Sequence, residues 1–175
     1  QPRRYFMNLQ TEKGWGEPVI KAFVYGIVTG IFILLWSLLD IIGVTRGIFS
    51  GDVGVIGFFS SIAGTVGGVF IFALIIMIIS YICNGRTNFE ISLRVSASLM
   101  IIIPLSAFLG FLDGINYVLG ALMSLGVNLY VVYMLYIALI HSLSSERKPA
   151  KAFSWILGGL MVLFVGIILY ARSAV

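Results

Sequence analysis

The chain has 175 residues, of which 60% are hydrophobic and only 10% are charged, and its formal net charge is +4. Because a soluble domain carries roughly 25% charged residues, this composition excludes an ordinary soluble enzyme and a disordered tail. The basic residues are too few and too scattered for a nucleic-acid-binding stripe, and the single cysteine, Cys83, excludes a disulfide scaffold. The composition therefore predicts an integral membrane protein.

Residues 1–21 form the longest polar stretch, and its first seven residues alternate cationic and aromatic side chains. We expect this stretch to be an interfacial segment on the inner leaflet, with Arg3 and Arg4 on anionic headgroups. A frayed tail is the alternative.

Five uncharged stretches follow this segment, and each is close to or above the roughly 20 residues that span a bilayer. They are residues 22–39, 53–83, 95–112, 114–140 and 152–171. The predicted fold of residues 22–175 is all-α, a polytopic membrane protein with a five-transmembrane-helix bundle.

Small residues recur at helical spacing in the first two spans. Gly26 and Gly30 share one face of the first span, and three glycines share one face of the second, namely Gly57, Gly64 and Gly68. Since membrane helices associate through close backbone packing, both stripes predict intramolecular helix contacts, with a homodimer contact as the alternative. A Gly64→Leu change should then abolish folding. Residues 51–57 form either a re-entrant turn or an external loop, and Asp52 with its neighbouring glycines favours the loop.

The third and fourth spans each contain one residue that interrupts an apolar helix. Pro104 lacks an amide proton, so it leaves the carbonyl of Met100 without its usual donor and predicts a kink. Asn128 lies near the middle of the fourth span, where an amide needs a hydrogen-bond partner. We expect Asn128 to make a polar contact between helices, with the freed carbonyl as a candidate acceptor. The alternative is that Asn128 lines a cavity.

The basic residues are distributed unequally between the two ends of the predicted spans. Nine of the eleven fall before the first span or in the connections after the second and fourth, and only Arg46 and Arg172 fall on the other side. The positive-inside rule therefore predicts a cytoplasmic N-terminus and an external C-terminus, in the inner or plasma membrane of the cell. The candidate contacts to anionic lipid headgroups are Arg3, Arg4, Lys21, Arg86, Arg94, Arg147, Lys148 and Lys151. Glu90, four residues before Arg94, predicts an ion pair at the membrane surface.

The sequence contains no constellation of residues that predicts catalysis. No charged residue lies at mid-depth, which argues against a proton-coupled or voltage-gated transporter. The only histidine, His141, lies at a span end, and one histidine with one cysteine falls short of a metal site. No GxSxG elbow and no phosphate-binding glycine loop is present. We therefore expect no enzyme, no cofactor, no metal and no nucleic-acid partner.

Three segments carry a resemblance to a known family. The first segment contains Pro-Arg-Arg-Tyr-Phe from residue 2 and continues to Glu17-Pro18. The second comprises residues 84–90 and leads through Leu93-Arg94-Val95 to Pro104. The third is residues 142–144, which precede Lys151-Ala152 and the last apolar stretch. In these segments the chain resembles bacterial and archaeal members of the Ypt-interacting-protein (Yip) domain family. The resemblance implies five transmembrane helices, a cytoplasmic N-terminus, an external C-terminus and no catalytic residues.

Two functions of different class follow as hypotheses. Eukaryotic relatives in the Yip family bind small GTPases or partner membrane proteins in vesicle transport, but this chain lacks their long acidic tail and their first-span Asp-Leu-Tyr-type motif, so GTPase binding is not carried over. The first hypothesis is a non-catalytic scaffold or membrane-organising protein that acts through lipids, through a homo-oligomer or through another membrane protein. The alternative is a small channel or transporter for a neutral or small solute, with a path near Pro104 and Asn128.

Overall fold

The structure is a computed structural model that describes residues 2–9, 14–38 and 55–173, and all of its regular elements in these ranges are helices. The helices are α1 (Pro2–Asn8), α2 (Gly16–Leu38), α4 (Val55–Ile82), α5 (Phe89–Leu99), α6 (Ile102–Leu109), α7 (Phe111–Ile115), α8 (Tyr117–His141) and α9 (Arg147–Ser173). Within the described part of the chain, five segments are long and apolar enough to cross a membrane, with α5 and α6 together forming the third. The predicted all-helical bundle of five spans is confirmed. The loop question at residues 51–57 falls largely outside the described residues.

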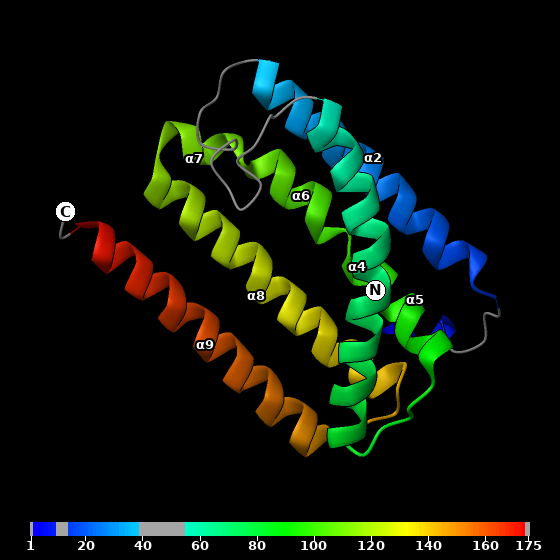
Figure 1. The fold of residues 1–175 in the computed structure, drawn as a ribbon. Helices are drawn as coiled ribbons and strands as arrows, with labels where there is room; N and C mark the ends of the chain where they lie inside the picture. The colour runs from blue at the N-terminus through cyan, green and yellow to red at the C-terminus, as the bar shows by residue number, and fades with distance from the viewer. Residues whose placement is uncertain (1, 10–13, 39–54, 174–175) are drawn as a thin grey trace.

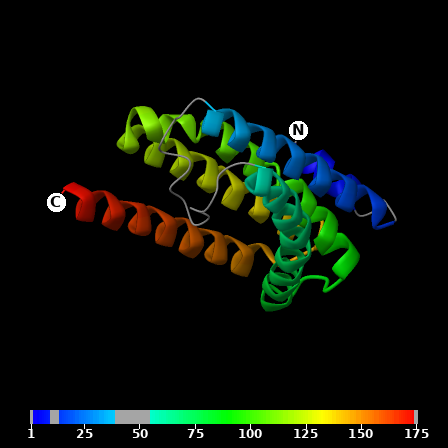
Figure 2. The same ribbon diagram turned by 45° about the horizontal axis from the view of Figure 1, so that its top comes forward.

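The spans alternate in direction, so that one end of the bundle collects three segments that are distant in sequence (Figure 1). These segments are α1 with residue 9, the connection between α4 and α5 (83–88), and the connection between α8 and α9 (142–146). We call this end of the molecule the basic end. The C-terminal end of α9 lies at the opposite end of the bundle (Figure 1). Figures 1 and 2 both place α9 on the outside of the bundle beside α8.

The third span begins earlier than its apolar run and is broken in the middle. Asn88 caps α5, since its side chain accepts hydrogen bonds from the backbone amides of Glu90 (2.9 Å) and Ile91 (3.3 Å). Helix α5 ends at Leu99, and the carbonyl of Met100 accepts a bond from Ile103 in a tight turn before α6. Pro104, four residues after Met100, has no amide with which to continue the α-helical ladder. The break lies where the sequence predicts a kink.

Helices α2 and α4 pack closely because glycines remove side chains from their contact. A Cβ placed on Gly26 would lie 2.7 Å from the Cα of Ile62, and one placed on Gly30 would meet the ring of Phe58 at 2.6 Å. The hydroxyl of Ser61 donates to the carbonyl of Gly26 at 3.0 Å, a bond that bridges the two helices. The close backbone approach expected of a small-residue stripe is therefore present on α2, and it is intramolecular.

The three glycines expected on the α4 side have different environments. A Cβ on Gly57 would lie 3.6 Å from Ile33 of α2, and one on Gly68 would lie 3.4 Å from the methyl group of Met100. Gly64 is exposed, and a Cβ there would meet no described atom within 4 Å. The expectation that Gly64 lies in a tight helix contact is therefore wrong among the described residues, and the effect of Gly64→Leu on folding stays a prediction. On α4, the partner of Gly26 is the stretch around Ser61 and Ile62, on a neighbouring face of the helix.

The core centres on α5. Half of the most apolar 18-residue stretch of the third span is buried, and the corresponding share is smaller in each of the other described spans. One cluster of buried side chains joins α1, α4, α5 and α8 to the first turn of α9, and a second joins α2, α4 and α5. The hydroxyl of Ser96 donates to the carbonyl of Val69 at 2.8 Å within this packing. Helix α5 therefore holds the α2–α4 pair against α8.

Candidate functional site at the basic end

The first part of the predicted interfacial segment is packed against the bundle through α1 and Leu9. Phe6 and Leu9 are each 1% exposed and belong to the core cluster of α4, α5 and α8. The hydroxyl of Ser142 donates to the carbonyl of Phe6 at 2.6 Å, and the Tyr5 hydroxyl lies 2.9 Å from that of Ser98. The sequence signal for this docking is the apolar pair at positions 6 and 9, one helical turn apart in a polar stretch. The predicted boundary at residue 21 also shifts, because α2 begins at Gly16.

Arg94 is a structural residue that ties the N-terminal segment to α5. Its side chain is 3% exposed, and its guanidinium donates to the carbonyl of Leu9 at 3.1 Å, to the carbonyl of Gly14 at 3.3 Å and to Glu90 Oε1 at 2.5 Å. The same carboxylate oxygen accepts a bond from the amide of Gly14 at 2.6 Å. The predicted Arg94–Glu90 pair is therefore present. The prediction that Arg94 contacts lipid headgroups is wrong, because the guanidinium is buried and bonded to backbone carbonyls.

Lys21, another candidate headgroup contact, is also engaged within the chain. Its ammonium group lies 2.5 Å from the Glu17 carboxylate and 3.2 Å from the Tyr5 hydroxyl, and its side chain is 29% exposed. The ammonium also sits 5.7 Å from the centre of the Tyr5 ring. Tyr5 therefore connects α1 to both α2 and α5. The sequence gives no signal for this link beyond the (i, i+4) spacing of Glu17 and Lys21.

The two connections at the basic end are joined by backbone hydrogen bonds. The amide of Arg86 donates to the carbonyl of Leu143 at 2.7 Å, and the amide of Glu146 donates to the carbonyl of Cys83 at 3.0 Å. Gly85 sits where the connections meet, and a Cβ there would collide with the hydroxyls of Ser80 and Ser145. A glycine is therefore required by the close approach of these two segments. Sequence reasoning did not single out Gly85 or Ser80, because their roles depend on a contact between positions more than 50 residues apart.

Five of the predicted headgroup contacts are exposed around this joined surface, namely Arg4, Arg86, Arg147, Lys148 and Lys151. None of the five forms an ion pair with any residue that the structure describes. The side chain of Arg3 lies outside the described residues. Two amphipathic aromatic side chains border the group, since Tyr81 and Trp155 are each 73% exposed near the ends of α4 and α9. This combination of cations and aromatic rings is typical of the level of lipid headgroups.

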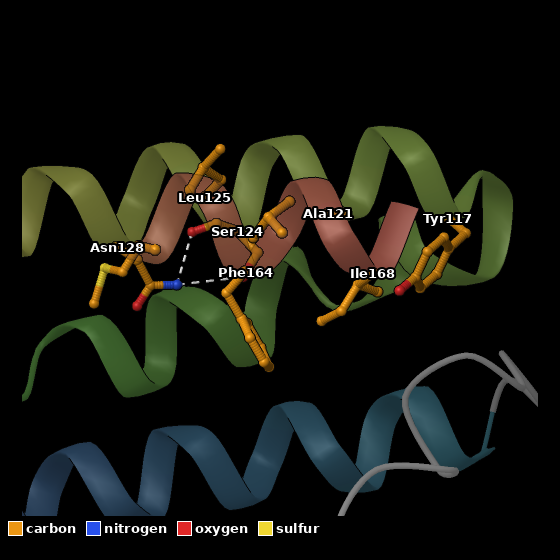
Figure 3. Close-up of a pocket in the computed structure, with 9 residues that line it drawn as sticks. Tyr117, Ala121, Ser124, Leu125, Asn128, Phe164 and Ile168 are labelled. Carbon is orange, nitrogen blue, oxygen red and sulfur yellow. Dashed lines mark hydrogen bonds between the residues drawn. The ribbon is translucent and has the colours of Figure 1, made fainter. Parts of the chain in front are cut away.

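The predicted polar core residues Asn128 and Pro104 do not form one site. Pro104 is buried in α6, whereas Asn128 lines a groove of about 420 Å³ between α8 and α9, together with Tyr117, Ser124, Phe164 and Ile168 (Figure 3). The Asn128 amide donates to the carbonyl of Ser124 at 2.8 Å, in its own helix. The expectation that the Met100 carbonyl accepts this bond is wrong, because the Asn128 amide donates to Ser124 instead. Of the two readings of Asn128, the structure favours a groove-lining residue.

Among the described residues, no three acidic, histidine or cysteine side chains gather as a metal site would require. Cys83 is 1% exposed at the end of α4, and burial raises the pKa of its thiol, which disfavours the thiolate. Binding of anionic groups is the chemistry that the exposed cations of the basic end support.

Comparisons with models of protein families, with curated proteins and with solved structures found no match to this chain. The function therefore has to be inferred from these residues and their geometry.

Proposed function

We propose that this chain is a non-catalytic integral membrane protein of the Yip-like type, a scaffold or membrane-organising protein related to trafficking. It acts through anionic lipid headgroups and protein contacts at its basic end. The observation that carries the proposal is the group of five exposed cations without an ion pair among the described residues. Each cation near an anionic surface contributes about 1 kcal/mol of attraction. The family assignment rests on the short motifs of the sequence alone.

The rigidity of this surface supports a scaffold. The cations are carried by α1, by the α4–α5 connection and by the first turns of α9, which are joined to one another by the bonds of Phe6 with Ser142 and of Arg86 with Leu143. A charged surface that is held in one arrangement needs no ordering when it binds, and so loses less entropy on binding. We propose that this surface faces the cytoplasm of the cell, at the inner membrane, with the C-terminus outside.

Lipid selectivity at the basic end tests the proposal. In bilayers of mixed composition, brominated anionic lipid should quench the fluorescence of Trp155 more strongly than brominated phosphatidylcholine does. A triple change of Arg147, Lys148 and Lys151 to Gln should reduce this preference by roughly tenfold or more at low salt, since each cation contributes about 1 kcal/mol. The matched control is Arg172→Gln, which removes a cation from the other end of α9. Equal quenching of the native protein by anionic and neutral lipid would refute headgroup binding.

The proposed orientation has its own test. A cysteine introduced at Lys148 should react with a membrane-impermeant maleimide only after the cytoplasmic face is opened, whereas one introduced at Ser173 should react in intact cells. The reverse pattern would overturn the cytoplasmic assignment of the basic end.

The transport alternative has less support, because the groove that contains Asn128 does not include Pro104. Solute flux through proteoliposomes that is lost on Asn128→Leu would restore it.

A further inference from the structure

The groove between α8 and α9 places a polar side chain where a membrane would supply none. Asn128 lies eleven residues from the first residue of the 25-residue helix α8, near its middle. At about 1.5 Å per residue, this position is roughly 16 Å from that end, close to the centre of a hydrocarbon core of about 30 Å. Figure 3 shows Asn128 and Ser124 at one end of the groove and Tyr117 at the other. The groove therefore extends over about one leaflet, in the half of the bundle away from the basic end.

Among the described residues, Asn128 uses only the donor side of its carboxamide in hydrogen bonds. Its amide nitrogen donates to the carbonyl of Ser124 at 2.8 Å and approaches the Ser124 hydroxyl at 3.4 Å. Its carbonyl oxygen accepts no hydrogen bond from any residue that the structure describes. Where lipid chains fill the groove they provide no donor, so an acceptor left without a hydrogen bond carries an energetic cost there. A donor from another polypeptide would remove that cost.

Helix α9, the other wall of the groove, has room for a further neighbour. None of the residues in its most apolar window is buried in the described part of the chain, and its main contact is with α8. Large apolar side chains project from it, including Leu160, Phe164 and Ile167, each more than half exposed. The same face of the molecule thus offers both a hollow and a row of bulky side chains. Helices pack by fitting such ridges into grooves.

We infer that a second copy of this chain packs on the α8–α9 face, with the two Asn128 amides paired across a two-fold axis. A carboxamide contains both a donor and an acceptor, so it can bond reciprocally to its own copy. Each amide keeps its bond to Ser124 and donates its second N–H to the carbonyl oxygen of the other. Self-complementarity of this kind is what a two-fold interface requires. The inference is independent of headgroup binding, which concerns the opposite end of the bundle.

Energy transfer between labelled copies of the full chain in bilayers tests the inference. As the ratio of protein to lipid rises, the native chain should pass from monomer to dimer. Asn128→Leu should weaken dimerisation by about 5- to 30-fold, the change expected for the loss of one to two buried interhelical hydrogen bonds. The matched control is Ser60→Leu, because Ser60 is also an exposed polar residue that bonds to its own helix, through Gly57 at 3.0 Å. Its dimerisation should equal that of the native chain.

A cross-linking experiment keeps the inference testable if Asn128→Leu fails to fold. A cysteine at Leu125, which lines the groove, should be captured as a dimer by a short thiol-reactive cross-linker, and a cysteine at Ser60 should not. Cys83 is 1% exposed and should give no background. A native chain that stays monomeric at high protein-to-lipid ratio, or equal capture at both positions, would overturn the inference. Native mass spectrometry that finds a lipid on a monomer, lost on Asn128→Leu, would overturn it in favour of a lipid site.

Discussion

Gly26 and Gly64 belong to the two small-residue stripes in the sequence, but the structure gives them opposite environments. A Cβ on Gly26 would lie 2.7 Å from the Cα of Ile62, whereas a Cβ on Gly64 would meet no described atom within 4 Å. The change from glycine to alanine is chemically identical at the two positions. Any difference between the two variants therefore reports the tertiary contact between α2 and α4.

The expected magnitudes follow from two opposing effects. Replacing glycine by alanine inside a helix favours folding by about 0.5–1 kcal/mol, because alanine loses less backbone entropy. Overpacking a close contact costs roughly 1–3 kcal/mol, and the upper part of that range applies at Gly26 because the opposing atom belongs to the backbone of Ile62. We expect Gly26→Ala to lower the free energy of unfolding by about 1–2 kcal/mol. Gly64→Ala should leave it unchanged or raise it by up to about 1 kcal/mol.

The measurement is reversible unfolding of each variant in mixed micelles, titrated with a denaturing detergent and followed by circular dichroism. The midpoint should move to lower detergent for Gly26→Ala only. Gly30→Ala should lie between the two, because the opposing ring of Phe58 is a side chain that can turn aside. Equal stability of the Gly26 and Gly64 variants, or the reverse order, would refute the close backbone contact between α2 and α4.

Two further predictions concern the basic end. Arg94→Met should lower the free energy of unfolding by roughly 2–3 kcal/mol, because the carbonyls of Leu9 and Gly14 lose a charged donor; hydrogen exchange should accelerate over residues 2–9, and not in Arg86→Met. Cys83 should react with N-ethylmaleimide at least about tenfold more slowly in the folded protein than after unfolding, because it is 1% exposed and burial raises the pKa of its thiol. Since the folded pKa lies above the unfolded value of about 8.5, the stability contributed by the neutral thiol is complete below that pH and is lost as the pH rises through the folded value. Rapid labelling at neutral pH would contradict this burial.

Some of the basic residues lie where a charge count predicts, and one does not. Counting Lys and Arg by connection correctly places Arg86 and Lys151 among exposed cations at one end of the bundle. The same count includes Arg94, which is 3% exposed and bonded to backbone carbonyls. Its partners are Leu9 and Gly14, about 80 residues earlier in the chain. A charge count cannot distinguish an exposed cation from the buried Arg94, because Arg94 is buried by the N-terminal segment that packs over its guanidinium.

The third span illustrates the same limit in a different way. Its apolar run starts at residue 95, but the helix starts at Phe89, because Asn88 caps it and the partly exposed Glu90 pairs with the buried guanidinium of Arg94. Pro104 correctly marks a break, since the missing amide is a property of the residue itself. The acceptor of the Asn128 amide could not be assigned in the same way. The acceptor depends on whether a neighbouring helix or the preceding turn of α8 lies nearer to the amide. In the structure the amide donates to the carbonyl of Ser124, one turn earlier in α8.

The sequence by itself determined what depends on local chemistry: five apolar spans, because each run approaches or exceeds the length that crosses a bilayer, and a helix break near Pro104, because proline has no amide proton. The tertiary structure decided what depends on which surfaces meet. It placed Gly26 in a helix contact and Gly64 outside one, packed Phe6 into the core, and left Asn128 on an open groove. Lipid and protein are almost equally apolar, so hydropathy marks which segments enter the membrane but carries little information about which face of a helix meets protein.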